Sequence, residues 1–209
     1  MKSELAWHFL AEKNGRPVYR DGKPAHAGDV LTHADSLVLC KSGLHYSTKP
    51  IDAVKYAPGP WICRVRVGDE RKYEGDKGVC RRREILWMAD AMPLLQALAR
   101  SWAASVLHLW PAPEIVVRYL ATGDESIRAA AWAAAWAAAG DAARAAAGDA
   151  ARAAAGAAAG DAARAAAWAA AWAAAGAAAR DAARDAQNAE FEAALATVER
   201  EIAAKGGEK

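Results

Sequence analysis

The sequence holds few of the residues that build disulfide scaffolds and metal sites. Its 209 residues include three cysteines, two phenylalanines and three methionines. The cysteines, Cys40, Cys63 and Cys80, are odd in number and show no CxxC spacing, which fits a reducing compartment better than a disulfide framework. No metal-ligand spacing occurs among the five histidines. These absences predict a cytoplasmic protein without a metal site.

Long apolar runs and a strong excess of one charge are also missing. The N-terminus has no basic-then-apolar signal pattern, and every charge-free window falls short of the roughly 20 apolar residues of a membrane span. The net charge is +2, whereas dedicated nucleic-acid binders are strongly basic. We therefore expect neither a membrane nor a nucleic acid as a partner. The one basic run, Arg81-Arg82-Arg83, is interpreted as a solvated strand edge or turn, with phosphate contact as the alternative.

Composition divides the chain into a mixed N-terminal domain and a helical remainder dominated by alanine. The predicted parts are an α+β ligand-binding domain at residues 1–90, connecting helices at 91–127, an alanine-rich helical repeat at 128–188, and an amphipathic C-terminal helix and tail at 189–209. In the first part, short apolar runs alternate with glycine and proline, and they predict strands at residues 5–10, 37–40, 61–67 and 79–87. Pro50 predicts the start of a short helix over residues 51–57. This order indicates an α+β fold with a mainly antiparallel sheet.

The stretch Gly43-Leu44-His45-Tyr46-Ser47 is the most informative motif. Its glycine permits close backbone approach, and its aromatic pair can stack on a flat ring. His45 lies 37 residues after His8, and Glu84 lies 39 residues after His45. This arrangement resembles the diphtheria-toxin-like ADP-ribosyltransferases, which carry a His-Gly strand, then a Gly-x-Tyr-Phe-Ala strand followed by a helix, and last a catalytic glutamate. Here Phe9 follows His8 in place of the family's glycine.

The resemblance implies a site for NAD as cofactor. His8 would hydrogen-bond a ribose hydroxyl, an aromatic side chain would stack on nicotinamide, and Glu84 would stabilise the charge that develops as nicotinamide leaves. His8 and Glu84 are therefore the candidate catalytic residues. The candidate ligand-binding residues are Gly43, His45, Tyr46, Ser47 and Tyr56.

The simpler interpretation of the same residues needs no ligand. His8 is then an ordinary strand histidine, and Glu84 is a surface ion-pair partner of little energetic weight. His45 and Tyr46 are adjacent on a strand, so at most one of them faces a given pocket.

The layout of the whole chain is also similar to uncharacterised phage-encoded proteins. These join a small Gly-Leu-His-containing domain to a tail of Ala-Ala-Ala-Trp and Asp-Ala-Ala-Arg repeats. The similarity covers most of the chain and implies a phage origin and a place in the host cytoplasm, but it carries no assigned chemistry.

The alanine-rich part repeats every four residues from Arg128 to Asn188 and is predicted to be helical, because alanine is the best helix former. Gly-Asp pairs at residues 140–141, 148–149 and 160–161 are typical of helix ends and new N-caps, and they favour a hairpin or a stack of short helices over a rod. The repeat carries two tryptophan pairs, Trp132 with Trp136 and Trp168 with Trp172. If exposed, they would bind a host protein or a second copy of the chain; otherwise they fill this half's own core.

Three functions remain open from the sequence. The first is a phage accessory protein whose transferase-like domain, active or degenerate, binds a nucleotide of the NAD or ADP-ribose type on a helical scaffold. The second is a non-enzymatic protein that sequesters a nucleotide or a host protein. The third is a structural homo-oligomer built on the helical half.

Overall fold

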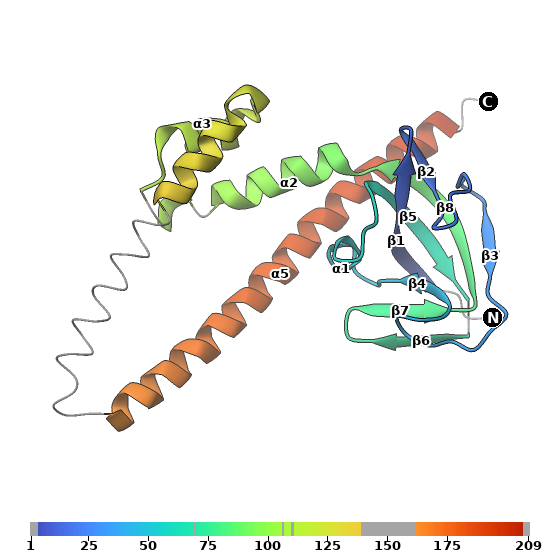
Figure 1. Ribbon diagram of the computed structural model, residues 1–209, viewed down its shortest axis with the longest axis horizontal. Helices are drawn as coiled ribbons and strands as arrows, with labels where there is room; N and C mark the ends of the chain where they lie inside the picture. Colours follow the sequence, from blue (N-terminus) through green and yellow to red (C-terminus); the bar gives the residue numbers. More distant parts are fainter. Residues whose placement is uncertain (1–3, 69, 106, 110, 139–161, 207–209) are drawn as a thin grey trace. The chain divides into compact units, whose positions relative to one another are not determined.

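The computed structural model describes residues 4–68, 70–105, 107–109, 111–138 and 162–206, and its fold is α+β, as predicted (Figure 1). Contacts divide the chain into two compact units. The first contains the residues up to Leu95 and returns from Asp185 onward, and the second covers Gln96–Arg184. The C-terminal segment therefore belongs with the N-terminal sheets rather than with the alanine-rich region.

Two antiparallel sheets form the centre of the first unit (Figure 1). The larger sheet has the strand order β2 (Arg16–Val18), β1 (Glu4–Lys13), β5 (Trp61–Val67), β8 (Arg82–Asp90), β3 (Val30–Thr32). The smaller sheet has the order β4 (Leu44–Tyr46), β7 (Lys77–Cys80), β6 (Arg71–Glu74). The two sheets join where β7 continues into β8 and where Trp7 and Ser47 exchange backbone hydrogen bonds of 2.8 and 2.9 Å.

Alternation along the strands gives the larger sheet two different faces. On β1, Ala6, His8 and Leu10 point to one face, which we call the inner face. It packs into a buried core that also takes in Tyr46 and Cys80 of the smaller sheet. The opposite face, the outer face, carries the alternate side chains, among them Trp7 and Phe9 of β1.

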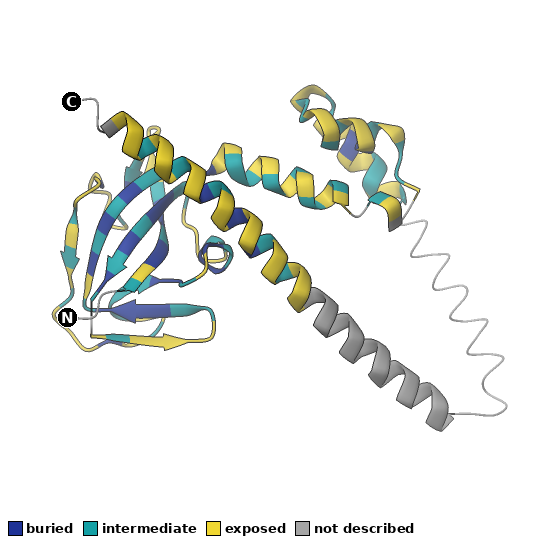
Figure 2. Cartoon of the chain, turned by 180° about the vertical axis from the view of Figure 1, so that it is seen from behind, coloured by how far each residue is buried: buried dark blue, intermediate teal, exposed yellow. Residues whose placement is uncertain are grey.

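The outer face is covered by the C-terminal part of α5 (Ala162–Gly206), which crosses the sheet in both ribbon views (Figures 1 and 2). Phe191 and Leu195 of this helix are 0% and 1% exposed. Polar contacts fix the same segment to the start of α1 (Pro50–Val54), since the Ile51 amide donates to Asn188 Oδ1 over 3.4 Å. The C-terminal segment, which was predicted to be an amphipathic helix, thus docks within its own chain.

The strand predicted at residues 37–40 is wrong. This apolar run forms a turn in which the Ser42 amide donates to the Val38 carbonyl over 2.8 Å, and Cys40 has a φ of 64°. Leu37 is buried, whereas Val38 is 41% exposed, so a short apolar run here anchors a loop instead of filling a strand position. The hairpin of β6 and β7 was also not predicted: residues 79–87 were expected to form one strand, whereas β7 ends at Cys80 and β8 begins at Arg82.

The second unit begins within α2 (Met92–Ser105) and contains two short 3-10 turns at Leu107–Leu109 and Glu125–Ile127, α3 (Glu114–Thr122), and a helix over residues 128–138. Gly123 ends α3 in the left-handed conformation, and Asp124 caps the next turn by accepting from the Ser126 amide over 2.9 Å. In α3 only Val116 is buried. α2 has no fully buried residue among those described.

The predicted breaks in the alanine repeat, at residues 140–141, 148–149 and 160–161, lie outside the described residues, as does the turn of the predicted hairpin. From Ala162 onward the chain is one helix to Gly206, so the boundary predicted between residues 188 and 189 is not a break in secondary structure. Among the helices described, none is both long and apolar enough to cross a membrane.

Candidate functional site

His8 and Glu84, the two predicted catalytic residues, lie on opposite faces of the larger sheet. His8 is paired with Cys63 on β5, and the inner face continues through Val65 to Ile85 on β8. Glu84 precedes Ile85 on the same strand and therefore points to the outer face. The structure does not bring these two side chains into one pocket.

Glu84 is engaged in ion pairs on the outer face. Its Oε2 accepts from Arg66 Nη1 over 3.0 Å and lies 3.7 Å from Arg82 Nη2. The Glu84 side chain is 24% exposed, and Arg66 and Arg82 are both more than 40% exposed. This is the ion-pair role that the simpler interpretation of the sequence gave to Glu84.

The Gly43-to-Ser47 motif mainly builds the core. A Cβ atom on Gly43 would lie 2.2 Å from Val79 Cγ2, so only glycine allows β4 and β7 to approach this closely. The Tyr46 ring is buried over Gly78, and burial raises the pKa of its hydroxyl to about 12. Ser47 is buried in the backbone pairing with Trp7. Three of the five predicted ligand-binding residues thus have structural roles.

Tyr56 lies on the surface, away from this core. It is 48% exposed, and its hydroxyl donates to Asp76 Oδ1 over 2.7 Å. Lys55 Nζ contacts the other oxygen of the same carboxylate over 2.7 Å, and both hydrogen bonds hold the pKa of Asp76 at about 2. Tyr56 therefore ties the end of α1 to the β6–β7 turn.

The inner face instead carries a charged residue that the sequence prediction placed in solvent. Arg83 is 4% exposed, because the alternation of β8 turns it inward beside Ile85. Its Nη1 donates to the main-chain oxygen of His45, while its buried Nε has no hydrogen-bond partner. No carboxylate in the described part of the chain forms an ion pair with Arg83.

The acidic groups around Arg83 are held in their neutral forms. Burial raises the pKa of the Cys63 thiol to about 12 and that of the Cys80 thiol to about 11, and it also raises the pKa of Tyr19. The Tyr19 hydroxyl donates to Asp29 Oδ2 over 2.7 Å, so the nearby carboxylate is already engaged with Tyr19. Burial lowers the pKa of Arg83, yet an arginine remains charged in proteins.

Two imidazoles complete this group, which we call the inner cluster: His8, His45 and Arg83. Burial, followed by the charge of Arg83, lowers the pKa of both histidines, so both are neutral at physiological pH. Each keeps part of its surface exposed, so the cluster is not sealed from solvent. His45 Nε2 accepts from the Cys40 amide over 3.2 Å, which leaves its Nδ1 to donate.

The inner cluster has the chemistry of an anion site. A buried guanidinium without a counter-ion is costly, and an incoming phosphate or carboxylate would supply the missing charge and accept hydrogen bonds. Arg83 was not among the predicted site residues, because Arg81-Arg82-Arg83 was interpreted as one solvated run. The strand period was the available signal, since it places Arg83 on the face opposite to its neighbours Arg82 and Glu84. Among the described residues, no group of three or more His, Cys, Asp and Glu side chains is placed to hold a metal.

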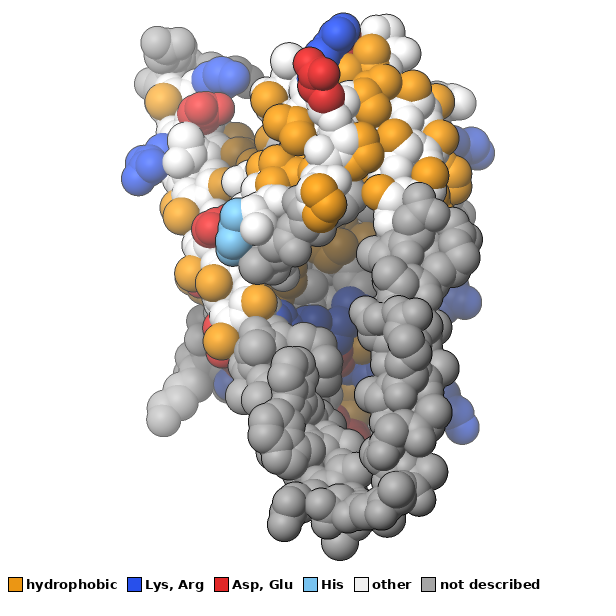
Figure 3. All heavy atoms as spheres, turned by 90° about the vertical axis from the view of Figure 1, so that its left-hand side faces the viewer, with side chains coloured by type: hydrophobic (Ala, Val, Ile, Leu, Met, Phe, Trp, Pro, Cys, Tyr) orange, Lys and Arg blue, Asp and Glu red, His pale blue; other side chains and the backbone are white. Residues whose placement is uncertain are grey.

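The first tryptophan pair of the alanine repeat is exposed. Trp132 and Trp136 are each 65% exposed, and their ring centroids are 5.7 Å apart. Apolar side chains gather in the upper part of the described surface in the space-filling view (Figure 3). Trp168 and Trp172 belong to α5, but their side chains lie outside the described residues. Trp132 and Trp136 therefore do not fill a core of this half, which was the alternative interpretation of the sequence.

Comparison with known proteins adds no family to this description: no protein-family model, no curated protein and no solved structure matches the chain.

Acidification is expected to destabilise the first unit through His8 and His45. Their pKa values are lowered in the folded state, so below about 6.5 the unfolded chain binds protons that the folded chain does not. Stability should therefore fall as the pH drops below about 6.5, by up to about 1.4 kcal/mol per pH unit for each histidine. Urea unfolding at pH 7.5 and pH 5.5 measures this, and His8→Phe should flatten the dependence. An unchanged dependence in His8→Phe would show that the pKa of His8 is not lowered in the folded protein.

Proposed function

We propose that the N-terminal α+β domain binds a small anionic ligand of the nucleotide type at the inner cluster, without catalysing its turnover. The observation that carries the proposal is the buried guanidinium of Arg83, which has an unpartnered Nε and no carboxylate partner among the described residues. A phosphate group is the best match, because arginine donates to it from two parallel N–H groups. NAD and ADP-ribose remain the first ligands to test, because of the transferase resemblance.

Binding without catalysis is favoured over ADP-ribosyl transfer by the position of Glu84. A transferase of the expected type needs its glutamate in the same NAD site as His8, and Glu84 is paired with Arg66 on the other face of the sheet. The function proposed here is therefore that of a phage accessory protein which sequesters a nucleotide in the host cytoplasm.

The proposal extends to the helical half as a scaffold that presents Trp132 and Trp136. Both rings are exposed on a helix whose neighbouring residues are alanines, so a partner can approach the backbone closely. A host protein or a second copy of the chain is the proposed partner. The hairpin arrangement of residues 128–188 is part of this proposal.

The test is the thermal shift of the purified full chain with NAD, ADP-ribose, ATP, cyclic dinucleotides and inorganic phosphate. A ligand at about 100 times its Kd adds about 2.7 kcal/mol of stability. Arg83→Met should abolish this shift while keeping or raising the stability of the ligand-free protein, because it removes an uncompensated buried charge. Arg83→Lys keeps the positive charge but loses the planar guanidinium group, so it should retain part of the thermal shift.

Two control variants separate this site from the predicted transferase site. Arg82→Met removes a neighbouring arginine on the outer face, and Glu84→Gln removes the predicted catalytic carboxylate; both should leave the shift unchanged. Absence of a shift with every ligand would refute the proposal. If the wild type releases nicotinamide from NAD and Glu84→Gln does not, the protein is an ADP-ribosyltransferase-like enzyme and the binding-only proposal is wrong.

A further inference from the structure

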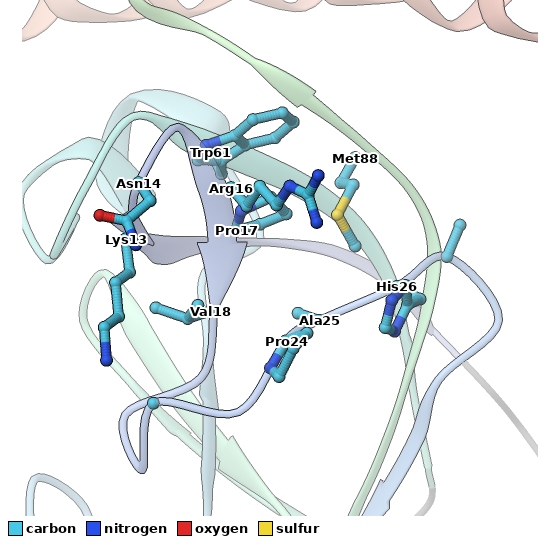
Figure 4. A pocket seen from close by; sticks show the side chains of 12 residues that line it. Lys13, Asn14, Arg16, Pro17, Val18, Pro24, Ala25, His26, Trp61 and Met88 are labelled. Carbon is cyan, nitrogen blue, oxygen red and sulfur yellow. The ribbon is translucent and has the colours of Figure 1, made fainter.

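A cavity opens beside the inner face of the larger sheet. It has a volume of about 820 Å³ and is bounded by the β1–β2 turn, by the segment from Gly22 to Ala27, and by Trp61 of β5 and Met88 of β8 (Figure 4). None of its lining residues belongs to the inner cluster. It is therefore a separate site, which no part of the proposed function uses.

The walls of this cavity are mostly apolar and come from different elements. Val18 and Pro24, which are joined by a backbone bridge, form one wall, and Trp61 and Met88 stand on the sheet beyond them (Figure 4). Trp61 and Met88 also pack against the buried core, so their positions are fixed by the sheet. The Nε1 atom of Trp61 donates to Glu12 Oε2 over 3.3 Å, and this hydrogen bond further orients the indole. An indole and a thioether on a rigid sheet suit a flat organic ring.

The polar groups of the cavity are all basic or neutral. Arg16 extends from β2 into the space towards Met88, and His26 lies on the far side, while Lys13 points away from the centre (Figure 4). No lining residue carries a carboxylate. Arg16 forms no ion pair with a carboxylate of the described residues. Its guanidinium is therefore available to an anionic group on a ligand.

We infer that this cavity binds an organic anion with a flat ring, which places the ring between Trp61, Met88 and Pro24 and its anionic group on Arg16. The site combines what a ring needs, apolar walls from rigid elements, with one positioned cation that sets the orientation of the ligand. The inference is independent of the inner cluster, because the two groups of residues do not overlap.

The experiment is a fluorescence titration of the full chain with 8-anilinonaphthalene-1-sulfonate, an anion with fused rings, beside N-phenyl-1-naphthylamine, its uncharged counterpart. We expect the sulfonate to bind more tightly than the neutral compound. Arg16→Gln should weaken sulfonate binding about tenfold, the loss of one charge-assisted hydrogen bond, and leave the neutral compound unaffected. Arg20→Gln, an exposed arginine in the turn that follows β2, is the matched control and should change neither.

A filling variant tests the position of the ring without removing a core side chain. Ala27 lines the cavity and is exposed, so Ala27→Phe should fold normally and block both compounds. Arg83→Met and the double variant Trp132→Ala, Trp136→Ala should leave sulfonate binding intact. Binding that survives both Ala27→Phe and Arg16→Gln would overturn the inference, and loss of binding in Arg83→Met would reassign the ring to the inner cluster.

Discussion

Replacing Phe191 by alanine is expected to lower the free energy of unfolding by about 3–5 kcal/mol, the usual loss for a buried phenylalanine. Phe191 is 0% exposed, and with Leu195 it forms the apolar anchor of α5 on the outer face of the sheet. Truncation leaves a cavity that the rigid sheet cannot close. Urea unfolding followed by far-UV circular dichroism at pH 7.5 measures the change.

Thr197→Ala is the control for the Phe191 variant. Thr197 lies on the same helix, is exposed, and should change stability by less than about 0.5 kcal/mol. If Phe191→Ala were equally mild, the C-terminal helix would not dock on the sheet in solution. The docked segment also explains the low exposure of Trp7 and Phe9 on the outer face, where the Trp7 ring lies under the Arg64 guanidinium at 4.3 Å and edge-on to Trp87 at 5.7 Å.

Replacing Gly43 by alanine should be almost as damaging, with an expected loss of about 2–4 kcal/mol from overpacking and backbone strain together. The added Cβ would lie 2.2 Å from Val79 Cγ2 and 2.9 Å from Leu37 Cδ2, and Gly43 has a φ of 118° that other residues rarely adopt. The β4–β7 pairing would have to open. That pairing also carries the His45 carbonyl to which Arg83 donates.

Gly75→Ala separates the clash from the strain in this experiment. Gly75 has a φ of 65°, but nothing lies within 4 Å of its added Cβ, so only the strain of about 1 kcal/mol should appear. Equal losses at both glycines would show that the contact with Val79 is relaxed in solution. A larger loss at Gly43, accompanied by weaker anion binding, would link the motif to the inner cluster through packing.

The strands of the N-terminal domain were predictable where local pattern and burial agree. Residues 61–67 alternate cleanly, and β5 occupies the same residues. The helix ends at Gly123 and Asp124 were predictable because a glycine in the left-handed conformation and an aspartate cap act through their own backbone. Residues 37–40 were predicted wrongly because only Leu37 of this apolar run is buried, and the backbone turns immediately after it.

The site was less predictable than the fold. His8 and His45 were picked from spacing, and the structure does place both near Arg83. Glu84 was picked by the same spacing, yet a shift of one residue along a strand turns a side chain to the other face. The residue at that shifted position, Arg83, is the one that the structure buries without a counter-ion.

The sequence by itself determined the class of fold, the two-part composition, and the helical character of the segments that the structure describes in the alanine-rich half, because these depend on local propensity and periodicity. Only the tertiary structure decided that the chain's last helix covers the outer face of the first domain, and which of three consecutive arginines enters its core. Both depend on contacts between residues far apart in the chain, such as Ile51 with Asn188 and Arg83 with His45, and local pattern does not encode such partners.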